Sequence, residues 1–194
     1  MCGIVGIISS KEVTGRILNS LKKLEYRGYD SAGIATLVDG NINEVKCEGR
    51  VEVLEKDITK FNLKGDIGIG HVRWATHGKP SKINAHPHSS EHVSVVHNGI
   101  IENSTILKKF LEKKGYEFKS QTDTEVIAHL VTEYLKKNSI KDTIIKVLKK
   151  LHGSFALGII FKAQSNLMVG AKRGSPLAVG LSLIHISEPT RPFH

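Results

Sequence analysis

The strands and helices that this sequence predicts come in clusters instead of alternating one by one along the chain. Apolar runs bounded by turn residues predict strands, and apolar residues at helical spacing predict helices. The expected strands cover residues 3–8, 32–38, 42–47, 66–75, 93–97, 154–161 and 167–171, with another starting at 177–179, and the expected helices cover 13–24, 51–61, 104–114, 122–137 and 139–151. Clusters of this kind favour an α+β fold, in which helices pack outside mainly antiparallel sheets.

Short turn and capping motifs support this assignment. Asp39-Gly40 separates two expected strands and favours a tight hairpin turn. Thr122 followed by Glu125 predicts a capping box at one helix start. Ser139 predicts the N-cap of the next helix.

The composition is that of an ordinary globular protein. The 194 residues are 40% hydrophobic and 24% charged, and the length predicts one domain, or one and part of a second. No apolar run approaches the roughly 20 residues that span a bilayer, and the short apolar start lacks the basic leader of a signal peptide. The two cysteines are Cys2 and Cys47, so we expect no stapling disulfide and a reduced, cytoplasmic setting. Cys47, in an expected hairpin, is interpreted as structural.

The chain is basic, with a formal net charge of +9. Many of its lysines come as pairs on expected helices, at 22–23, 108–109, 113–114, 136–137 and 149–150. A nucleic-acid surface and solvated helix faces are the two interpretations. The second is favoured because the pairs are spread over separate helices and no aromatic residues are interleaved with them. We therefore expect no nucleic-acid partner and no membrane partner.

Residues 181–194 differ in character from the rest of the chain. The run at 181–191 resembles the translation of a transposase-type sequencing adapter, and such artefacts are excluded from fold reasoning. The expected domain therefore covers residues 1–180, and the chain is expected to be an N-terminal fragment of a longer protein. A genuine natural C-terminus is the alternative, and independent reads across codon 181 would distinguish the two.

Cys2 is the first residue with a chemical signature. Initiator methionine is normally removed before a small residue, which would give Cys2 a free α-amine beside its thiol. Their ordinary pKa values are about 7.7–8.0 and about 8.5, so the two groups can exchange a proton near neutral pH. One residue could then serve as both nucleophile and base. Taken alone this signal is weak, and an ordinary buried cysteine is the favoured interpretation.

Two further motifs follow apolar strands. Arg73 lies at an expected strand end that runs into the aperiodic loop 76–92, and an arginine there can clamp a carboxylate or form a surface ion pair. Loops of that length are often functional. Asn98-Gly99 can supply an amide and a backbone N–H to an oxyanion hole, or can be a simple turn.

Asp123 completes the set. It lies at an expected helix start, where it can pair with a substrate ammonium or compensate the helix dipole. Cys2, Arg73, Asn98-Gly99 and Asp123 together supply a nucleophile, a cation for an α-carboxylate, an oxyanion stabiliser and an anion for an α-ammonium. These are the groups that glutamine hydrolysis needs, and their conjunction is more specific than any one of them.

The motifs resemble the glutaminase domain of the glutamine–fructose-6-phosphate aminotransferases, which make glucosamine 6-phosphate for hexosamine biosynthesis. The resemblance is carried by Cys2-Gly3-Ile4-Val5-Gly6, Leu24-Glu25-Tyr26-Arg27-Gly28-Tyr29-Asp30-Ser31-Ala32-Gly33, His71-x-Arg73-Trp74-Ala75-Thr76-His77-Gly78, Asn84-Ala85-His86-Pro87-His88, His97-Asn98-Gly99-Ile100-Ile101-Glu102-Asn103 and Thr122-Asp123-Thr124-Glu125-Val126-Ile127. It covers residues 1–180. It implies a four-layer α/β/β/α sandwich of two mainly antiparallel sheets, of the N-terminal nucleophile hydrolase type, incomplete at its C-terminus.

The resemblance also implies catalytic roles. Cys2 would attack the glutamine carboxamide and form a thioester, while Asn98 and the Gly99 N–H would hold the oxyanion. Arg27 would lie near the Cys2 end of the site. No cofactor or metal is implied.

For the substrate, the resemblance implies a second group of residues. Arg73, with Thr76 and His77, would bind the α-carboxylate of L-glutamine, and Asp123 would bind its ammonium group with help from the neighbouring Gly99. Trp74 would gate the passage of ammonia. Fructose 6-phosphate would be bound only by further domains that this chain lacks, and the full-length protein is expected to be a homodimer.

Three other interpretations are weaker. His86-x-His88, with His77, His92 and His97 nearby, could suggest a metal site, but zinc sites need a convergent spacing that is not seen here. The chain could be the glutaminase half of another amidotransferase, such as those of the purine or asparagine pathways. It could also be an inactive fragment with an unpaired sheet edge.

Overall fold

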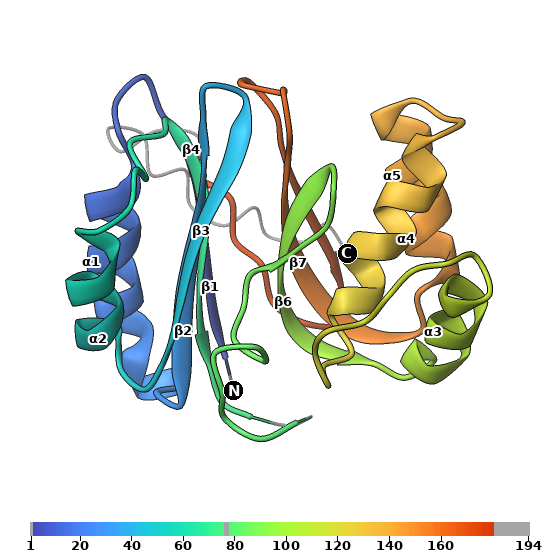
Figure 1. The fold of residues 1–194 in the computed structure, drawn as a ribbon, viewed down its shortest axis with the longest axis horizontal. Helices are drawn as coiled ribbons and strands as arrows, with labels where there is room; N and C mark the ends of the chain where they lie inside the picture. The colour runs from blue at the N-terminus through green and yellow to red at the C-terminus, as the bar shows by residue number, and fades with distance from the viewer. Residues whose placement is uncertain (1, 76–77, 181–194) are drawn as a thin grey trace, which may run out of the picture.

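The computed structural model describes residues 2–75 and 78–180 of the chain. These residues form two four-stranded antiparallel sheets that lie face to face, with helices on both outer sides (Figure 1). The four-layer α/β/β/α sandwich and the α+β class expected from the sequence are therefore confirmed. The tail at 181–194 lies outside the described residues, as do Thr76 and His77.

The first sheet has the order β1-β4-β2-β3, and every neighbouring pair is antiparallel. Its strands are β1 (Gly3–Ile8), β2 (Ser31–Val38), β3 (Asn41–Glu48) and β4 (Ile67–Arg73). Helices α1 (Thr14–Leu24) and α2 (Val51–Ile58) cover its outer face, and a short 3-10 helix, Glu25–Arg27, follows α1. The predicted hairpin at Asp39-Gly40 joins β2 to β3, as expected.

The second sheet has the order β5-β6-β7-β8. Its strands are β5 (His88–Ser89), β6 (Val93–Ile101), β7 (Gly153–Phe161) and β8 (Met168–Arg173). Helices α3 (Ser104–Glu112), α4 (Glu125–Leu135) and α5 (Ile140–Lys150) cover its outer face. No helix in the described part of the chain is both long and apolar enough to cross a bilayer.

Three apolar layers hold the four structural layers together. One fills the space between α1–α2 and the first sheet, and includes Ile17, Leu21 and Leu54. A smaller one lies between the two sheets, where Ile69 of β4 packs near Ile160 of β7. The third lies between the second sheet and α3–α5. Since each sheet buries both faces, the sandwich excludes water from its interior and leaves its strand ends as the place for polar groups.

The structure corrects the sequence at several places, among them the short strand β5, which lies inside the expected loop 76–92. Residues 177–179, expected to start a strand, have no regular structure. The capping box is wrong: α4 begins at Glu125, whose carboxylate accepts backbone N–H bonds from Lys119 (2.9 Å) and Ser120 (2.7 Å). The strand expected to end at residue 97 continues to Ile101. By contrast, the Ser139 cap is confirmed, because its hydroxyl accepts the Asp142 N–H at 3.1 Å.

Candidate functional site

A polar pocket lies where several strand ends meet. It is lined by Cys2, Arg73, Trp74, His86, His97, Gly99, Thr122, Asp123 and Thr124. Cys2 comes directly before β1, and β1 pairs with β4 so that Gly3 lies opposite Val72, one residue before Arg73. The sheet register therefore brings Cys2 and Arg73 to the same edge although 70 residues of sequence separate them.

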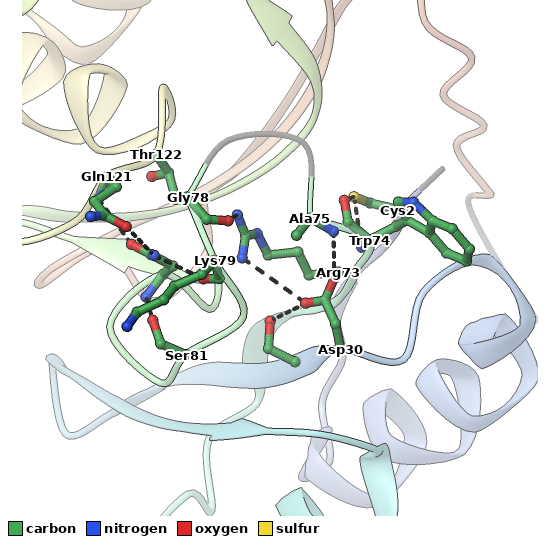
Figure 2. Close-up of polar contacts among 12 residues, drawn as sticks. Cys2, Asp30, Arg73, Trp74, Ala75, Gly78, Lys79, Ser81, Gln121 and Thr122 are labelled. Atoms are coloured by element: carbon green, nitrogen blue, oxygen red, sulfur yellow. Dashed lines mark hydrogen bonds and ion pairs between the residues drawn. The ribbon is translucent and has the colours of Figure 1, made fainter.

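Cys2 contacts both sheets. Its Sγ accepts the backbone N–H of Trp74 at 3.3 Å (Figure 2), and its carbonyl oxygen accepts bonds from Asn98 Nδ2 (3.2 Å) and Arg27 Nε (3.3 Å). Burial raises the pKa of the Cys2 thiol, and the Trp74 hydrogen bond partly opposes that increase. The thiol thus needs a nearby base to become a thiolate at neutral pH.

Asn98 and Gly99 lie inside β6, not in a turn. Asn98 pairs with Ala156 of β7, and Gly99 pairs with Phe155. Gly99 has φ +137°, and a Cβ there would lie 2.1 Å from the Ser154 carbonyl oxygen, so the position requires glycine. The simple-turn interpretation of Asn98-Gly99 is therefore wrong, and the Asn98 amide points to Cys2.

Arg73 ends β4 and is buried, with 3% of its surface exposed. Its Nη2 donates to the Gly78 carbonyl at 3.1 Å, and its Nη1 lies 4.0 Å from Asp30 Oδ1 (Figure 2). The surface ion-pair interpretation is wrong, because both groups are largely removed from solvent. A buried guanidinium at a pocket wall can bind a carboxylate through two parallel N–H bonds.

Asp30 is a residue that the sequence reasoning quoted in a motif but did not assign. Its carboxylate accepts the backbone N–H of Ala75 and the Ser31 hydroxyl (2.9 Å), besides lying near Arg73 (Figure 2). Just before it, Gly28 allows the chain to approach β4 closely, since a Cβ there would lie 2.5 Å from the Arg73 carbonyl carbon. The Gly28–Asp30 segment thus fixes the segment that leaves β4.

Trp74 and Asp123 lie on different sides of the pocket. Trp74 is half exposed and stands edge-on to Tyr29, with ring centroids 5.6 Å apart. Asp123 is buried, and its Oδ2 accepts the Ile101 N–H at 2.7 Å. Its Oδ1 lies 4.0 Å from His97 Nδ1, and the residue lines the pocket. Asp123 is thus anchored to β6, next to Gly99.

Buried histidines surround one side of the pocket: His86 and His97 line it, and the His88 ring lies 4.7 Å from the His86 ring. His86 and His97 each contact the Thr124 hydroxyl, and His88 contacts the Thr122 hydroxyl at 3.0 Å. Burial lowers the pKa of His88 to about 3. In the described ranges no group of His, Cys, Asp and Glu is arranged to hold a metal ion. The His86-x-His88 side chains serve to bond the loop to the segment before α4.

Cys47 lies away from this pocket. It is buried on β3 beneath α2, its Sγ contacts the Arg50 carbonyl at 3.7 Å, and neither it nor Cys2 forms a disulfide. Burial raises the pKa of its thiol. The structural role expected for Cys47 fits this position in the α2 layer.

Residues 71–180 match the family model for a glutamine amidotransferase domain. The glutamine–fructose-6-phosphate aminotransferase (isomerizing) of Clostridium acetobutylicum is 53% identical over 184 residues, which is 94% of this chain and 30% of that protein. The protein of the same name from Bartonella henselae is 51% identical over 181 residues, 93% of this chain and again 30% of the relative. The chain therefore spans about a third of the length of these relatives.

A solved structure gives the same result for the fold. The glutamine phosphoribosylpyrophosphate amidotransferase of B. subtilis superposes with a TM-score of 0.74 at 30% identity, covering 89% of this chain and 37% of that one. The two antiparallel sheets and their outer helices match that amidotransferase domain. The N-terminal nucleophile hydrolase type of fold, expected from the sequence, is thereby confirmed.

Proposed function

The chain belongs to the family of glutamine amidotransferase domains, and from that premise we propose that it hydrolyses L-glutamine to glutamate and ammonia through a thioester on Cys2. The proposal rests on one observation: Cys2, Arg73, Gly99 and Asp123 line the same pocket. Each of these residues comes from a different segment of the chain, and each matches one part of the substrate.

The reaction begins once Met1 has been removed and the Cys2 amine is free. The amine takes the thiol proton, and the thiolate attacks the carboxamide carbon of glutamine. The negative charge on the oxygen is stabilised by Asn98 Nδ2 and the Gly99 N–H. The amine then gives its proton to the leaving nitrogen, ammonia departs, and water hydrolyses the thioester to release glutamate.

The two charged ends of glutamine are bound by opposite walls of the pocket. Arg73, with Thr76 and His77, binds the α-carboxylate, for which a planar guanidinium is well suited. Asp123 binds the α-ammonium with help from Gly99. The burial of Arg73 and Asp123 supports this assignment, because charge pairs are stronger away from water. Arg27 supports the Cys2 backbone through its bond to the Cys2 carbonyl.

The ammonia is proposed to be used by the rest of a longer enzyme. By analogy with its 53% identical relative, the acceptor is fructose 6-phosphate and the product glucosamine 6-phosphate, made in a part that this chain does not contain. Trp74, which lines the pocket and is half exposed, is proposed to gate the ammonia that leaves Cys2. The complete enzyme is proposed to be a homodimer. An acceptor of the purine type is less favoured, because identity to that enzyme is 30%.

A glutamine-like diazoketone tests the proposed function. We expect it to alkylate Cys2, as mapped by peptide mass spectrometry, and glutamine to protect against it. The chain carrying Cys2→Ser should take no label and hydrolyse no glutamine. Cys47→Ser is the matched control, and it should label at Cys2 as the unmodified chain does. Label on Cys47 alone, or unimpaired hydrolysis by Cys2→Ser, would exclude the mechanism.

Intact-mass measurement tests the role of the amine. Active chain should have lost Met1. Active chain that retains Met1 would rule out the Cys2 α-amine as the base.

The domain limits are a proposal of their own. We propose that residues 1–180 are the native part and that they form an incomplete glutaminase domain. The full-length enzyme should then hydrolyse glutamine well, while residues 1–180 alone should be weakly active or aggregate, and removing 181–194 should change neither property. Stable, full activity of residues 1–180 would refute the incompleteness.

A further inference from the structure

Thr124 occupies the N-cap position of α4 but does not cap it. Threonine at that position usually accepts a backbone N–H of the first helical turn through its side chain. Here the side chain makes no capping bond. Its hydroxyl, fully buried, lies 2.8 Å from His86 Nε2 and 2.9 Å from His97 Nδ1. The hydroxyl therefore serves the two imidazoles and not the helix.

His71 connects His97 to His86 and so completes a ring of contacts with Thr124. His71 Nε2 lies 2.9 Å from the His97 carbonyl oxygen, which can only accept, so His71 carries its proton on Nε2. The His71 ring stacks on the His86 ring, with centroids 4.1 Å apart and planes 18° apart. His71, His97, Thr124 and His86 thus form a closed circuit, named here the histidine–threonine cluster. All four residues are buried.

Thr124 is the member of the cluster whose side chain bonds two imidazole rings. A hydroxyl has one proton to donate, so at least one of the two imidazoles must donate its N–H to Thr124. The hydroxyl can donate to one ring and accept from the other, or accept from both, so it completes both bonds in each of these tautomers without charging a ring. Burial lowers the pKa of His71 to about 3, and also lowers the pKa of His86, so these rings are neutral at physiological pH.

The four members come from four segments, and three of those segments carry proposed substrate contacts. His71 lies on β4, two residues before Arg73, and His97 lies on β6, two residues before Gly99. Thr124 directly follows Asp123. The cluster thus joins, beneath the pocket, the two walls that bind the charged ends of the substrate.

We propose that Thr124 is a positioning residue for glutamine binding, whose hydroxyl holds the Asp123 segment at a fixed distance from Gly99 and Arg73. It touches no reacting atom and acts through its neighbours. This inference rests on the proposed function. It predicts that loss of the hydroxyl weakens recognition of glutamine while the reactivity of the Cys2 thiol is unchanged.

The test is Thr124→Val, which keeps the shape and removes the hydroxyl. With the glutamine-like diazoketone, the concentration for half-maximal inactivation should rise at least about tenfold, since two buried hydrogen bonds are lost. The maximal inactivation rate and the rate of alkylation by iodoacetamide, which needs no glutamine site, should stay within about threefold. If the role of Thr124 were merely structural, Thr124→Val would change the half-maximal concentration and both rates together, or would only lower the melting temperature.

Two further variants make the result decisive. Thr124→Ser keeps the hydroxyl and should bind the diazoketone within about threefold of the unmodified chain, even if Thr124→Val fails to fold. Thr132→Val is the matched control, because its buried hydroxyl on α4 bonds Ser90 and not the cluster. It should leave diazoketone affinity unchanged.

The outcomes separate the two proposals. The positioning role is overturned if Thr124→Ser loses as much diazoketone affinity as Thr124→Val does. It is also overturned if a folded Thr124→Val retains its affinity. In either case the proposed function stands. An unmodified chain that takes no label at Cys2 overturns the proposed function, and the positioning role with it.

Discussion

The Asp30 carboxylate shows how one residue outside the pocket lining sets the position of a proposed binding group. It accepts the Ala75 N–H and the Ser31 hydroxyl, and lies 4.0 Å from the Arg73 guanidinium. An unsatisfied buried N–H costs about 1–3 kcal/mol, so loss of this acceptor should release the segment at Ala75. The role of Asp30 is not visible in the sequence, because two of its partners, Arg73 and Ala75, lie more than 40 residues away.

Asp30→Ala should therefore raise the KM for glutamine about tenfold with little change in kcat, because Arg73 is no longer held toward the substrate. Asp30→Asn retains an acceptor for the Ala75 N–H and should have a smaller effect. Steady-state glutaminase assays measure both. Asp57→Ala is the control, because it removes from α2 a carboxylate that pairs with Lys60. It should leave KM unchanged. An Asp30→Ala enzyme with unaltered KM would contradict this role.

Strand β6 is the element in which local preference and tertiary structure differ most. Asn-Gly favours a turn by itself, but here the pair continues the strand to Ile101, because Asn98 and Gly99 each find a β7 partner. The ladder bonds to β7 override the local preference. The strand thereby carries the Asn98 amide to Cys2 and places Gly99 in the lining of the pocket.

Gly99→Ala tests the close packing of β6 against β7. The new Cβ would meet the Ser154 carbonyl and sit at φ +137°, so the free energy of unfolding should fall by more than about 2 kcal/mol and glutaminase activity should be lost. Gly115→Ala is the matched control, since φ is +87° there but nothing lies within 4 Å of the new Cβ. It should cost only about 1 kcal/mol and retain activity. Urea unfolding measures both, and equal losses would exclude the clash.

The start of α4 gives a second case. The spacing of Thr122 and Glu125 fits a capping box, but Thr122 bonds the His88 ring, and Glu125 accepts N–H bonds from the segment before the helix. Burial raises the pKa of Glu125, but hydrogen bonds with His129, Lys119 and Ser120 lower it by more, and the pKa falls to about 2. Contacts with His88 and with the segment just before the helix thus decide how the helix begins.

Across the whole molecule, the two sheets are joined by apolar packing and, at one end, by neutral histidines. Ile69 and Ile160 belong to the apolar layer between the sheets, while His71 of the first sheet bonds the backbone of His97 in the second. A charged imidazole cannot occupy this interior without a large desolvation cost. The fold therefore depends on pH through groups that the reaction itself does not use.

As the pH is lowered, the protein should unfold at a higher pH than protonation of its carboxylates alone would cause. The folded-state pKa is about 3 for His71 and His88, and lower than usual for His86, whereas an unfolded histidine titrates near pH 6.5. Below about pH 6.5 the unfolded chain thus binds more protons than the folded one, so the free energy of unfolding falls as pH falls. The contribution is complete above about pH 6.5 and is lost progressively toward pH 3.

Urea unfolding at about pH 7, 6 and 5 measures this dependence, in a range where most carboxylates stay ionised. The slope should approach at most about 4 kcal/mol per pH unit for three histidines. His88→Gln removes one of the titrating groups and should reduce the slope by about a third. A stability that is flat between about pH 7 and pH 5 would contradict the neutral, buried state of these rings.

The sequence by itself determined most of the strands and helices, the α+β class, the antiparallel sheets and the residue types of the pocket. Those follow from periodicity and turn chemistry, which act between near neighbours, and from motifs that retain their spacing. Only the tertiary structure decided that β6 runs through Asn98-Gly99, that Asp30 holds the segment at Ala75, and that Thr124 serves two histidines instead of its helix. Each of these is set by partners distant in sequence, whose hydrogen bonds in a buried setting outweigh the local preference.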